Sequence, residues 1–574
     1  MRLVELKIEN FRGIRLLHLP LDGLTVLIGE NNVGKSTVLE AIRLVLTRGT
    51  GSRRMGQFSE YDFHLVDAKA TPQTAQPIKI VIHFAEGQEN EWPDPVIQQM
   101  NEVVQLDTDG LNHIWLQAEG FFNPDSASFE NKWAFLNSNG AELILKNSTS
   151  LNLISRFTPL FFLSALRDAS QEFGQRGQFW SGFLKSIQLP EDKREELEEM
   201  LQEVNNSVIG ANARLGEVTQ KIAEARRLVP LDSTNPVVLE AIPTRVFDLV
   251  GKIQVHLKST SGAKLPLHRH GEGTQSLAVL MLFQAFATAN LAEAYAPEST
   301  PILALEEPEA HLHPSAIRSL GAFLESMAGQ ILVSSHSGDL VSRVPVRSLR
   351  RLYKLNGETR VGRVENDLFT DRELQVIDYR IRLSKGHYLF SRCWLLVEGE
   401  SDFHLIPLIF EALDLSQDQV SFSALEFSQV FEKGVSFIKL AKALGIQWFM
   451  MADGDQEGDG YINLANEYLE HGENLADRAR KLNYPDIEHE FWHNGYDNFI
   501  RDMVDNSSKN QIHSVTKGDA AQETKQLIKA AIKQAGGKPA FAQALATEIK
   551  IRGSGTIPQT IKDIITRVVQ LAGG

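Results

Sequence analysis

The stretch GENNVGKST, residues 29–37, constrains the fold of this chain more than any other feature. It matches the phosphate-loop pattern G-x-x-x-x-G-K-[ST], and it lies between the apolar run LTVLIG and the helical pattern KSTVLEAIRLVL. In such a loop the glycines let backbone N–H groups close around phosphates at the helix N-terminus, Lys35 neutralises the terminal phosphates, and Ser36 can ligate Mg²⁺. We therefore predict a strand, loop and helix that bind ATP, with contacts from Asn31, Asn32, Gly34, Lys35, Ser36 and Thr37.

Three later segments carry residues suited to the same ATP site. The apolar run PILALEE ends in Glu306 and Glu307, where one acid can hold the Mg²⁺ shell and the next can orient the attacking water. A second apolar run, QILVSSH, ends in His336, whose imidazole can sense or polarise the γ-phosphate. The turn GEGT contains Gly271 and Gly273, which can offer backbone donors to phosphate, although such a turn is also an ordinary helix start.

Length and composition limit the class of protein. A chain of 574 residues is too long for one hydrophobic core, so we expect roughly two to four domains. The single cysteine, Cys393, excludes a disulfide framework and a cysteine-rich zinc module, and it fits a reducing cytoplasm. Because no apolar run approaches the ~20 residues that span a bilayer, and the N-terminus has the pattern of an amphipathic strand, we expect a cytoplasmic protein.

The charge is unevenly distributed. The net charge of -15 argues against general affinity for nucleic acids, but residues 501–574 contain 11 Lys and Arg against 6 Asp and Glu, a local balance of +5. Positive charge at this end of the chain can lie along a phosphate backbone. A solvated helical surface explains the same charge, and charge alone favours that simpler interpretation.

A second group of acids follows two other apolar runs. In LLVEGESDF the acids are Glu398, Glu400 and Asp402, and in FMMADGD they are Asp453 and Asp455. Acids at a helix start complement its dipole, which accounts for Glu400 and Asp402 but less easily for Glu398 at a strand end. Because the ends of parallel strands meet at one edge of a sheet, and clustered carboxylates repel one another unless a cation neutralises them, the pattern indicates a Mg²⁺ or Mn²⁺ site.

A third acidic segment, YPDIEHEFWHNGYDN, offers Glu488 and Glu490 as further metal ligands. The alternative is that both are surface acids. The sequence does not decide which of the two binds metal.

The order of the first set of motifs resembles the ABC-type ATPases, including the SMC and recombination-repair proteins. In that family the glycine turn of one protomer completes the ATP site of another, so the resemblance implies a dimer. Two features depart from the family pattern: the turn reads GEGTQS rather than LSGGQ, and Glu306 stands where Asp is more usual, which leaves the hydrolysis rate open. The resemblance also implies an acid or amide after the first helix that assists the metal, for which Gln57 and Asp62 are candidates.

The Glu-Gly and Asp-x-Asp pair resembles the Toprim fold of topoisomerases, primases and OLD nucleases. The whole chain, including the segment SALRDA at residues 164–169, resembles the OLD (overcoming lysogenization defect) family. This resemblance implies phosphodiester hydrolysis with two divalent ions at the Toprim acids. It also implies a catalytic lysine beyond the Toprim core, and Lys538 in GGKPAF stands at the matching position.

We therefore predict an α/β multidomain chain, in which an ABC-type P-loop ATPase with a helical insert precedes a Toprim domain and C-terminal helices. The predicted ranges are 1–167 for the first part of the ATPase, 168–245 for a helical dimerisation insert, 246–390 for the second part of the ATPase, 391–500 for the Toprim nuclease, and 501–574 for the helical region with the lysine.

The predicted function is an ATP-regulated, metal-dependent DNA endonuclease with ATP and Mg²⁺ as cofactors, or Mn²⁺ at the nuclease site. The resemblance implies a role in antiphage defence, a homodimer or higher oligomer, and leaves open a partner such as a helicase, a reverse transcriptase or a retron nucleic acid. The alternative is an SMC-like DNA-binding or repair ATPase whose Toprim half binds without cleaving. The presence of Glu398, Asp453 and Asp455 together counts against this alternative.

Overall fold

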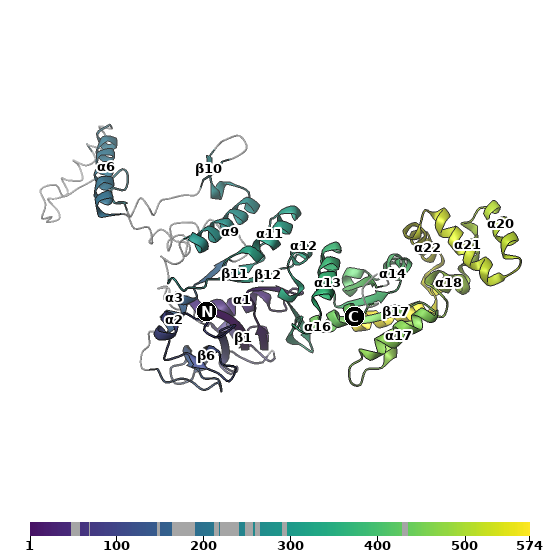
Figure 1. The fold of residues 1–574 in the computed structure, drawn as a ribbon, viewed down its shortest axis with the longest axis horizontal. Helices are drawn as coiled ribbons and strands as arrows, with labels where there is room; N and C mark the ends of the chain where they lie inside the picture. The colour runs from purple at the N-terminus through teal and green to yellow at the C-terminus, as the bar shows by residue number, and fades with distance from the viewer. Residues whose placement is uncertain are drawn as a thin grey trace.

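The phosphate loop belongs to a two-layered N-terminal part (Figure 1). The computed structural model describes residues 1–47, 58–67, 69–145, 150–163, 190–211, 217, 240–246, 256–258, 264–289, 296–427 and 434–573. One layer is an antiparallel sheet of order β2-β1-β4-β6-β5, with β7 on β6. Its strands are β1 (Arg2–Phe11), β2 (Ile14–Pro20), β4 (Ile78–Ala85), β5 (Gln105–Leu106), β6 (Asn112–Asn123) and β7 (Ser128–Leu136).

The other layer is the sheet that carries the ATP motifs. Its order is β14-β13-β3-β12-β11-β8, and all neighbours are parallel except β14, which pairs antiparallel with β13. The strands are β3 (Leu24–Ile28), β8 (Leu160–Leu163), β11 (Ile302–Glu306), β12 (Gln330–Ser334), β13 (Leu349–Leu355) and β14 (Glu358–Gly362). Because segments far apart in the sequence become neighbours, β3, β11 and β12 end at the same edge of the sheet.

Helices fill both faces of this sheet. Helix α1 (Lys35–Leu46) buries Val38, Ile42 and Val45 between the two sheets, as expected from its apolar spacing. On the opposite face, α9 (Glu272–Ala289) and α11 (Pro314–Ser326) bury Leu280 and Leu320 against the sheet. The α/β ATPase architecture predicted from the sequence is therefore confirmed.

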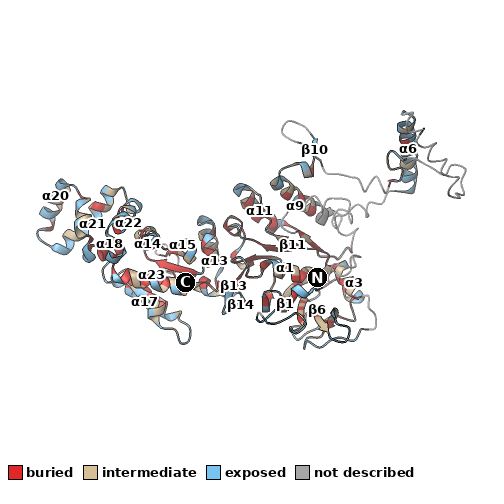
Figure 2. Cartoon of the chain, turned by 180° about the vertical axis from the view of Figure 1, so that it is seen from behind, coloured by how far each residue is buried: buried red, intermediate tan, exposed pale blue. Residues whose placement is uncertain are grey.

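A second parallel sheet begins at Cys393. Its order is β16-β15-β17-β18, with strands β15 (Cys393–Val397), β16 (Phe422–Glu426), β17 (Gln447–Ala452) and β18 (Ala479–Lys481). The strand β15 is buried along its whole length, as is typical of a parallel strand covered by helices on both faces. Figure 2 shows this concentration of buried residues on both parallel sheets. The predicted Toprim-like sheet is confirmed as an α/β unit.

The strands of this second sheet are contacted by α14 (Glu400–Ala412), α17 (Gln456–Glu467) and α23 (Gln559–Leu571). A further group of helices packs on α14 and on one another: α18 (Ile487–Phe491), α19 (Asp497–Asp502), α20 (Asn506–Thr516), α21 (Ala520–Ala535) and α22 (Lys538–Arg552). Helix α22 packs on α14, and α23 returns to β15 and β17. The predicted C-terminal helices are therefore confirmed, and they share a hydrophobic core with the sheet. The exact residue boundaries of the domains stay predictions.

The predicted helical insert is described in part by α6 (Glu191–Gly210). Met200, Val204 and Val208 lie four residues apart along it, and all three are exposed. Figure 2 shows α6 as largely exposed. Gln57 and residues 164–169 lie outside the described residues. In the described part of the chain, no helix combines the length and apolarity needed to cross a membrane.

The two parallel sheets are held together by a buried arginine. Arg351, on β13 and paired in register with Ile28 of β3, is only 2% exposed. Its guanidinium donates hydrogen bonds to the carbonyl oxygens of Leu389 at 3.2 Å, Ser391 at 2.9 Å and Gly445 at 3.1 Å. These acceptors flank the start of β15 and β17, so one side chain of the ATPase sheet fixes the base of the Toprim sheet.

We expect Arg351→Met to lower the thermal stability of the protein strongly. The substitution keeps an unbranched side chain but leaves at least three carbonyl groups without their donor, and each buried unpaired group costs about 1–3 kcal/mol. The midpoint of thermal unfolding, followed by circular dichroism, should fall by roughly 5 °C or more. Arg360→Met, which removes an exposed arginine paired with Glu358, is the matched control and should change the midpoint little. Equal midpoints for the two variants would contradict the role given to Arg351.

Candidate active sites

The phosphate loop is shaped by two glycines with left-handed backbone. Gly29 has φ 139°, and a Cβ on it would lie 2.2 Å from the carbonyl oxygen of Leu352, so no other residue fits at this point. Gly34 has φ 108° and begins α1, whose first turn contains neither an acidic residue nor a capping side chain. The first N–H groups of the helix are thus open to an anionic ligand.

Lys35 lies folded over this loop. Its ammonium donates to the carbonyl oxygens of Gly29 and Glu30, both at 2.8 Å, and its side chain is buried. Burial lowers the pKa of Lys35 to about 8, against the opposing effect of nearby carboxylates that include Glu307. Asn31, Asn32 and Ser36 are exposed and Thr37 is half-buried, so these predicted ligands line an accessible loop.

The end of the acid strand β11 and the histidine after β12 lie close together. Glu306 ends β11 and pairs in register with Ser334, and the N–H of Glu307 donates to the Ser334 carbonyl at 2.9 Å. Nε2 of His336 lies 3.3 Å from a carboxylate oxygen of Glu307. Burial and then the charge of Lys35 lower the pKa of His336. The structure therefore brings Lys35, Glu307 and His336 within one electrostatic neighbourhood.

Glu309 is a residue of this site that sequence reasoning missed. Its Oε1 accepts hydrogen bonds from the Ser335 hydroxyl at 2.6 Å and from the His336 N–H at 2.9 Å. Its Oε2 is buried without a hydrogen-bond partner, and burial raises the pKa of Glu309. The only signal in the sequence was a third acid in EEPEA. Glu309 holds the segment Ser335–His336 in place through these two hydrogen bonds, and the direction of its side chain cannot be read from the sequence.

Two other predicted ATP-site features have local contacts. A Cβ on Gly273 would lie 2.7 Å from the carbonyl oxygen of His311, and Glu272 pairs with His311 at 2.9 Å, so the structure places the glycine turn with Gly271 and Gly273 beside the acid strand of its own chain. The carboxylate of Asp62 accepts hydrogen bonds from Ser59 and from Arg12 at 2.8 Å. These contacts give Asp62 a structural role in the loop before β4.

The second site forms where β15 and β17 end side by side. Val397 pairs with Met451, so Glu398 and Asp453 follow neighbouring parallel strands, and the Asp453 N–H donates to Oε2 of Glu398 at 3.0 Å. Asp402 lies in the first turn of α14, 3% exposed, where its Oδ2 accepts from the Gly399 N–H at 3.0 Å. Its Oδ1 is buried without a hydrogen-bond partner.

These carboxylates repel one another in a buried environment. Burial, with the charges of Glu488 and Glu398, raises the pKa of Asp402 to about 8. Burial, followed by the charge of Asp402, raises the pKa of Asp453 to about 9. Burial and then the charge of Asp486 raise the pKa of Glu488. We name Glu398, Asp402, Asp453, Asp486 and Glu488 the acid cluster.

The acid cluster fits a divalent cation. A buried carboxylate oxygen without a partner and several mutually repelling acids are satisfied by a hard cation with oxygen ligands. The described residues contain no ready-made cage of three or more ligating side chains, so burial and electrostatics, rather than ligand distances, define this candidate metal site.

The other predicted ligands occupy different places. Asp455, two residues after Asp453, caps α17 by accepting a hydrogen bond from the Gly458 N–H at 2.9 Å. Its side chain is exposed. The Ser401 hydroxyl donates to Glu488 at 2.6 Å and fixes it in the acid cluster. Glu490 instead accepts from the Asn483 N–H at 3.0 Å, which ties down the loop before α18 and places its carboxylate outside the acid cluster.

Asp486 is the member of the acid cluster that sequence reasoning missed. It caps α18 by accepting from the His489 N–H at 2.8 Å, and its carboxylate is 2.6 Å from Nδ1 of His489. Its charge raises the pKa of Asp402, Asp453 and Glu488. In the sequence YPDIEHE, the only sign of this role was an acidic residue directly before a short helix.

Lys538 lies at the rim of the acid cluster. Gly537, with φ 111°, precedes α22 and directs its first residue toward α14, where the Lys538 ammonium lies 3.9 Å from Glu400. The charge of Lys538 also acts to lower the pKa of Glu488. The structure therefore brings this lysine to the site, although it lies well over a hundred residues after Glu398 in the sequence.

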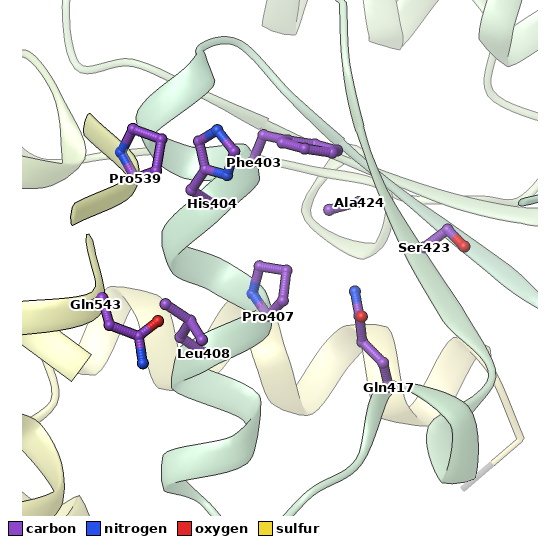
Figure 3. Close-up of a pocket in the computed structure, with 9 residues that line it drawn as sticks. All are labelled: Phe403, His404, Pro407, Leu408, Gln417, Ser423, Ala424, Pro539 and Gln543. Atoms are coloured by element: carbon purple, nitrogen blue, oxygen red, sulfur yellow. The ribbon is translucent and has the colours of Figure 1, made fainter. Parts of the chain in front are cut away.

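A pocket of about 400 Å³ borders the same helices (Figure 3). Phe403 and His404, which follow Asp402 on α14, line it together with Pro539, which follows Lys538 on α22. Gln417 and Ser423 close the other side, from α15 (Gln417–Val420) and β16. An aromatic and amide-lined hollow thus lies between α14, α22, α15 and β16.

Two family models match the chain. One, described as "Protein of unknown function (DUF2813)", matches residues 1–387, and one described as "Overcoming lysogenization defect protein-like, TOPRIM domain" matches residues 389–455. The chain therefore belongs to the DUF2813 family and has the ATPase–Toprim organisation of the OLD family.

Several characterised and uncharacterised proteins are similar over most of their length. The uncharacterized protein YbjD of Escherichia coli strain K12 is 25% identical over 595 aligned positions, which cover 100% of both chains. The OLD nuclease of Thermus scotoductus is 23% identical over 478 positions, 79% of this chain and 82% of the relative. Endonuclease GajA of Bacillus cereus is 21% identical over 432 positions, 72% of this chain and 68% of the relative.

We expect metal-free protein to lose stability as the pH rises from about 4 to about 9. The folded-state pKa values of Asp402 and Asp453, about 8 and about 9, lie above their ordinary value of 3.8. The folded form then binds more protons than the unfolded form across this interval, so stability falls with pH, by on the order of a few kcal/mol. Thermal unfolding in the presence of a chelator should show the decline, and Mg²⁺ should reverse it at pH 8.

The test is a comparison of pH profiles. Asp402→Asn removes one charge from the acid cluster and should flatten the profile, while Glu467→Gln, an exposed acid at the end of α17, should leave it unchanged. Identical pH profiles for wild type and Asp402→Asn would exclude a destabilising charge at Asp402.

Proposed function

We propose that the chain is an ATP-binding and ATP-hydrolysing, divalent-metal-dependent DNA endonuclease. The observation that carries this proposal is the acid cluster at the shared edge of β15 and β17, with a lysine at its rim. The relatives named OLD nuclease and Endonuclease GajA support it. A Toprim half that only binds DNA would not need several buried carboxylates in mutual repulsion, so the cluster favours cleavage over the SMC-like alternative.

The residues that would hold the metal ions are those of the acid cluster together with Asp455. When bound, Mg²⁺ or Mn²⁺ supplies Lewis-acid stabilisation of negative charge on the phosphate and lowers the pKa of water. Ser401 positions Glu488 through its 2.6 Å hydrogen bond. The Lys538 ammonium can stabilise negative charge that develops on the phosphodiester, because a fixed cation at a partly buried site interacts more strongly than one in water.

At the ATP site we assign the roles from the geometry around the loop. Lys35 turns from its own loop carbonyls to the phosphates, and the open N-terminus of α1 receives them. Ser36 and Glu306 are the candidate Mg²⁺ ligands, and Glu307 is the group that orients water. Glu309 holds the N–H of His336, which keeps the imidazole beside Glu307.

The assembly we propose is a homodimer or higher homo-oligomer. The apolar stripe Met200, Val204 and Val208 on α6 supports it, because three large apolar side chains spaced by four residues form one exposed helix face. An antiphage role, and a partner such as a helicase, a reverse transcriptase or a retron nucleic acid, stay predictions that go with the resemblance to the OLD family. The cytoplasmic location stays a prediction from the cysteine content and the apolar runs of the sequence.

We expect wild type to nick supercoiled plasmid DNA in the presence of Mg²⁺ or Mn²⁺. Asp453→Ala should reduce the rate by about 100-fold or more, because it removes a carboxylate from the metal site. Gel electrophoresis of the plasmid, with and without ATP, measures this rate. Lys35→Ala should retain cleavage and change only its dependence on ATP.

Glu467→Ala, which removes an exposed acid of α17, is the control and should cleave like wild type. The absence of nicking by wild type under every condition would refute the nuclease assignment, and so would nicking that survives Asp453→Ala.

ATP hydrolysis is a separate expectation. Glu307→Gln should slow phosphate release by about 100-fold or more, because the neutral amide lacks the negative charge with which Glu307 orients and polarises the attacking water. A fluorescent nucleotide should still bind with near-normal affinity, because Lys35 and the loop are retained. Hydrolysis at the wild-type rate by Glu307→Gln would remove the catalytic role of Glu307.

A further inference from the structure

An ion pair connects the phosphate loop directly to the Toprim sheet. Glu30, the second residue of the loop motif, pairs with Arg392, the residue immediately before β15. The contact is bidentate, with Nη2 of Arg392 at 2.8 Å from Oε2 of Glu30 and Nε bonded to Oε1. The two residues are 362 positions apart in the sequence, so the pair exists only in the assembled fold.

The Glu30 end of this pair is hydrogen-bonded to the lysine of the phosphate loop. The backbone carbonyl of Glu30 accepts a hydrogen bond from Lys35 at 2.8 Å. A nucleotide that binds the loop takes the Lys35 ammonium for its own phosphates and breaks this hydrogen bond. It also brings negative charge close to the Glu30 carboxylate, which is repelled toward the other cations near it, Arg392 and Arg351.

The Arg392 end is tied to the strands of the nuclease site. The Arg392 N–H donates to the Ser421 carbonyl at 2.8 Å, and its own carbonyl accepts from the Gln447 N–H at 2.9 Å. Arg392 therefore lies between the beginnings of β15, β16 and β17. The opposite ends of β15 and β17 lead directly into Glu398 and Asp453 of the acid cluster.

We propose that the Glu30–Arg392 ion pair transmits nucleotide occupancy of the phosphate loop to the acid cluster. Arg351 holds the base of the two sheets in place, and the Glu30–Arg392 pair at the rim is the part whose geometry changes when the loop is filled. This regulation rests on the proposed function, because it describes how ATP controls the proposed nuclease site. An exposed bidentate ion pair supplies a coupling of roughly twofold to fivefold between the two sites.

The experiment compares full-length wild type, Arg392→Gln, Arg392→Lys and, as a control, Arg363→Gln, which removes an arginine paired with Glu365 in the ATPase part. Two readouts are measured with and without a non-hydrolysable ATP analogue. One is the rate of plasmid nicking in Mg²⁺ or Mn²⁺. The other is backbone hydrogen exchange of the segments that contain residues 392–399 and 447–453, which does not require cleavage.

In wild type and Arg363→Gln, the analogue should change the nicking rate by roughly twofold to fivefold and alter exchange in both Toprim segments. In Arg392→Gln both responses should vanish, although the analogue still protects the phosphate loop. Arg392→Lys, which keeps the charge without the bidentate contact, should give an intermediate response.

Four results would overturn the proposal. The first is a response of Arg392→Gln to the analogue as large as that of wild type, and the second is an equal loss of response in Arg363→Gln. The third is the absence of any change in hydrogen exchange when wild type binds the analogue. The fourth is an Arg392→Gln variant that no longer binds the analogue, because Arg392 would then belong to the nucleotide site itself. A wild type that shows the exchange response but never nicks DNA refutes the nuclease assignment and leaves the coupling between the two sites standing.

Discussion

The organisation of the C-terminal half depends on the repulsion among carboxylates gathered where β15 and β17 end. Parallel pairing of the two strands brings Glu398 and Asp453 into hydrogen-bond contact, and the first turn of α14 adds a fully buried Asp402. The surrounding groups each reduce the electrostatic cost: the Gly399 N–H donates to Asp402, the Ser401 hydroxyl donates to Glu488, and Lys538 approaches from α22. These contacts are insufficient to neutralise the acid cluster, since the pKa values of Asp402 and Asp453 remain far above their ordinary range. A bound divalent cation would supply the missing charge.

The N-terminal half applies the same structural principle to a different ligand. Three parallel strands, β3, β11 and β12, end at one edge, where Lys35, Glu306, Glu307 and His336 gather. The two sheets share one hydrophobic core, in which Trp394 and Leu396 of β15 lie with Leu349 of β13. Arg351 adds hydrogen bonds to carbonyl oxygens at this junction. Such a junction allows a change at the phosphate loop to reach the acid cluster without a large movement of either sheet.

The sequence was sufficient where a residue follows directly from a strand end. Glu398, Asp453, Glu307 and His336 each come after an apolar run, and parallel pairing then fixes their meeting place. The sequence was insufficient where the direction of a side chain determines whether the residue joins the site. Glu488 and Glu490 are two residues apart, yet Ser401 holds Glu488 in the acid cluster and Asn483 holds Glu490 outside it. Asp486 and Glu309 were missed for the same reason. The pairs that join the halves, Arg351 with its carbonyls and Glu30 with Arg392, depend on contacts between segments far apart in the chain.

The most direct measurement of the central claim is the binding of Mn²⁺ to nucleotide-free protein, followed by the electron paramagnetic resonance signal of the free ion. If the acid cluster is a metal site, wild type at neutral pH binds Mn²⁺, and Asp402→Asn binds it about 10- to 100-fold more weakly. Equal affinities in wild type and Asp402→Asn, or no binding of Mn²⁺ by wild type, would contradict the account of the acid cluster as a metal centre.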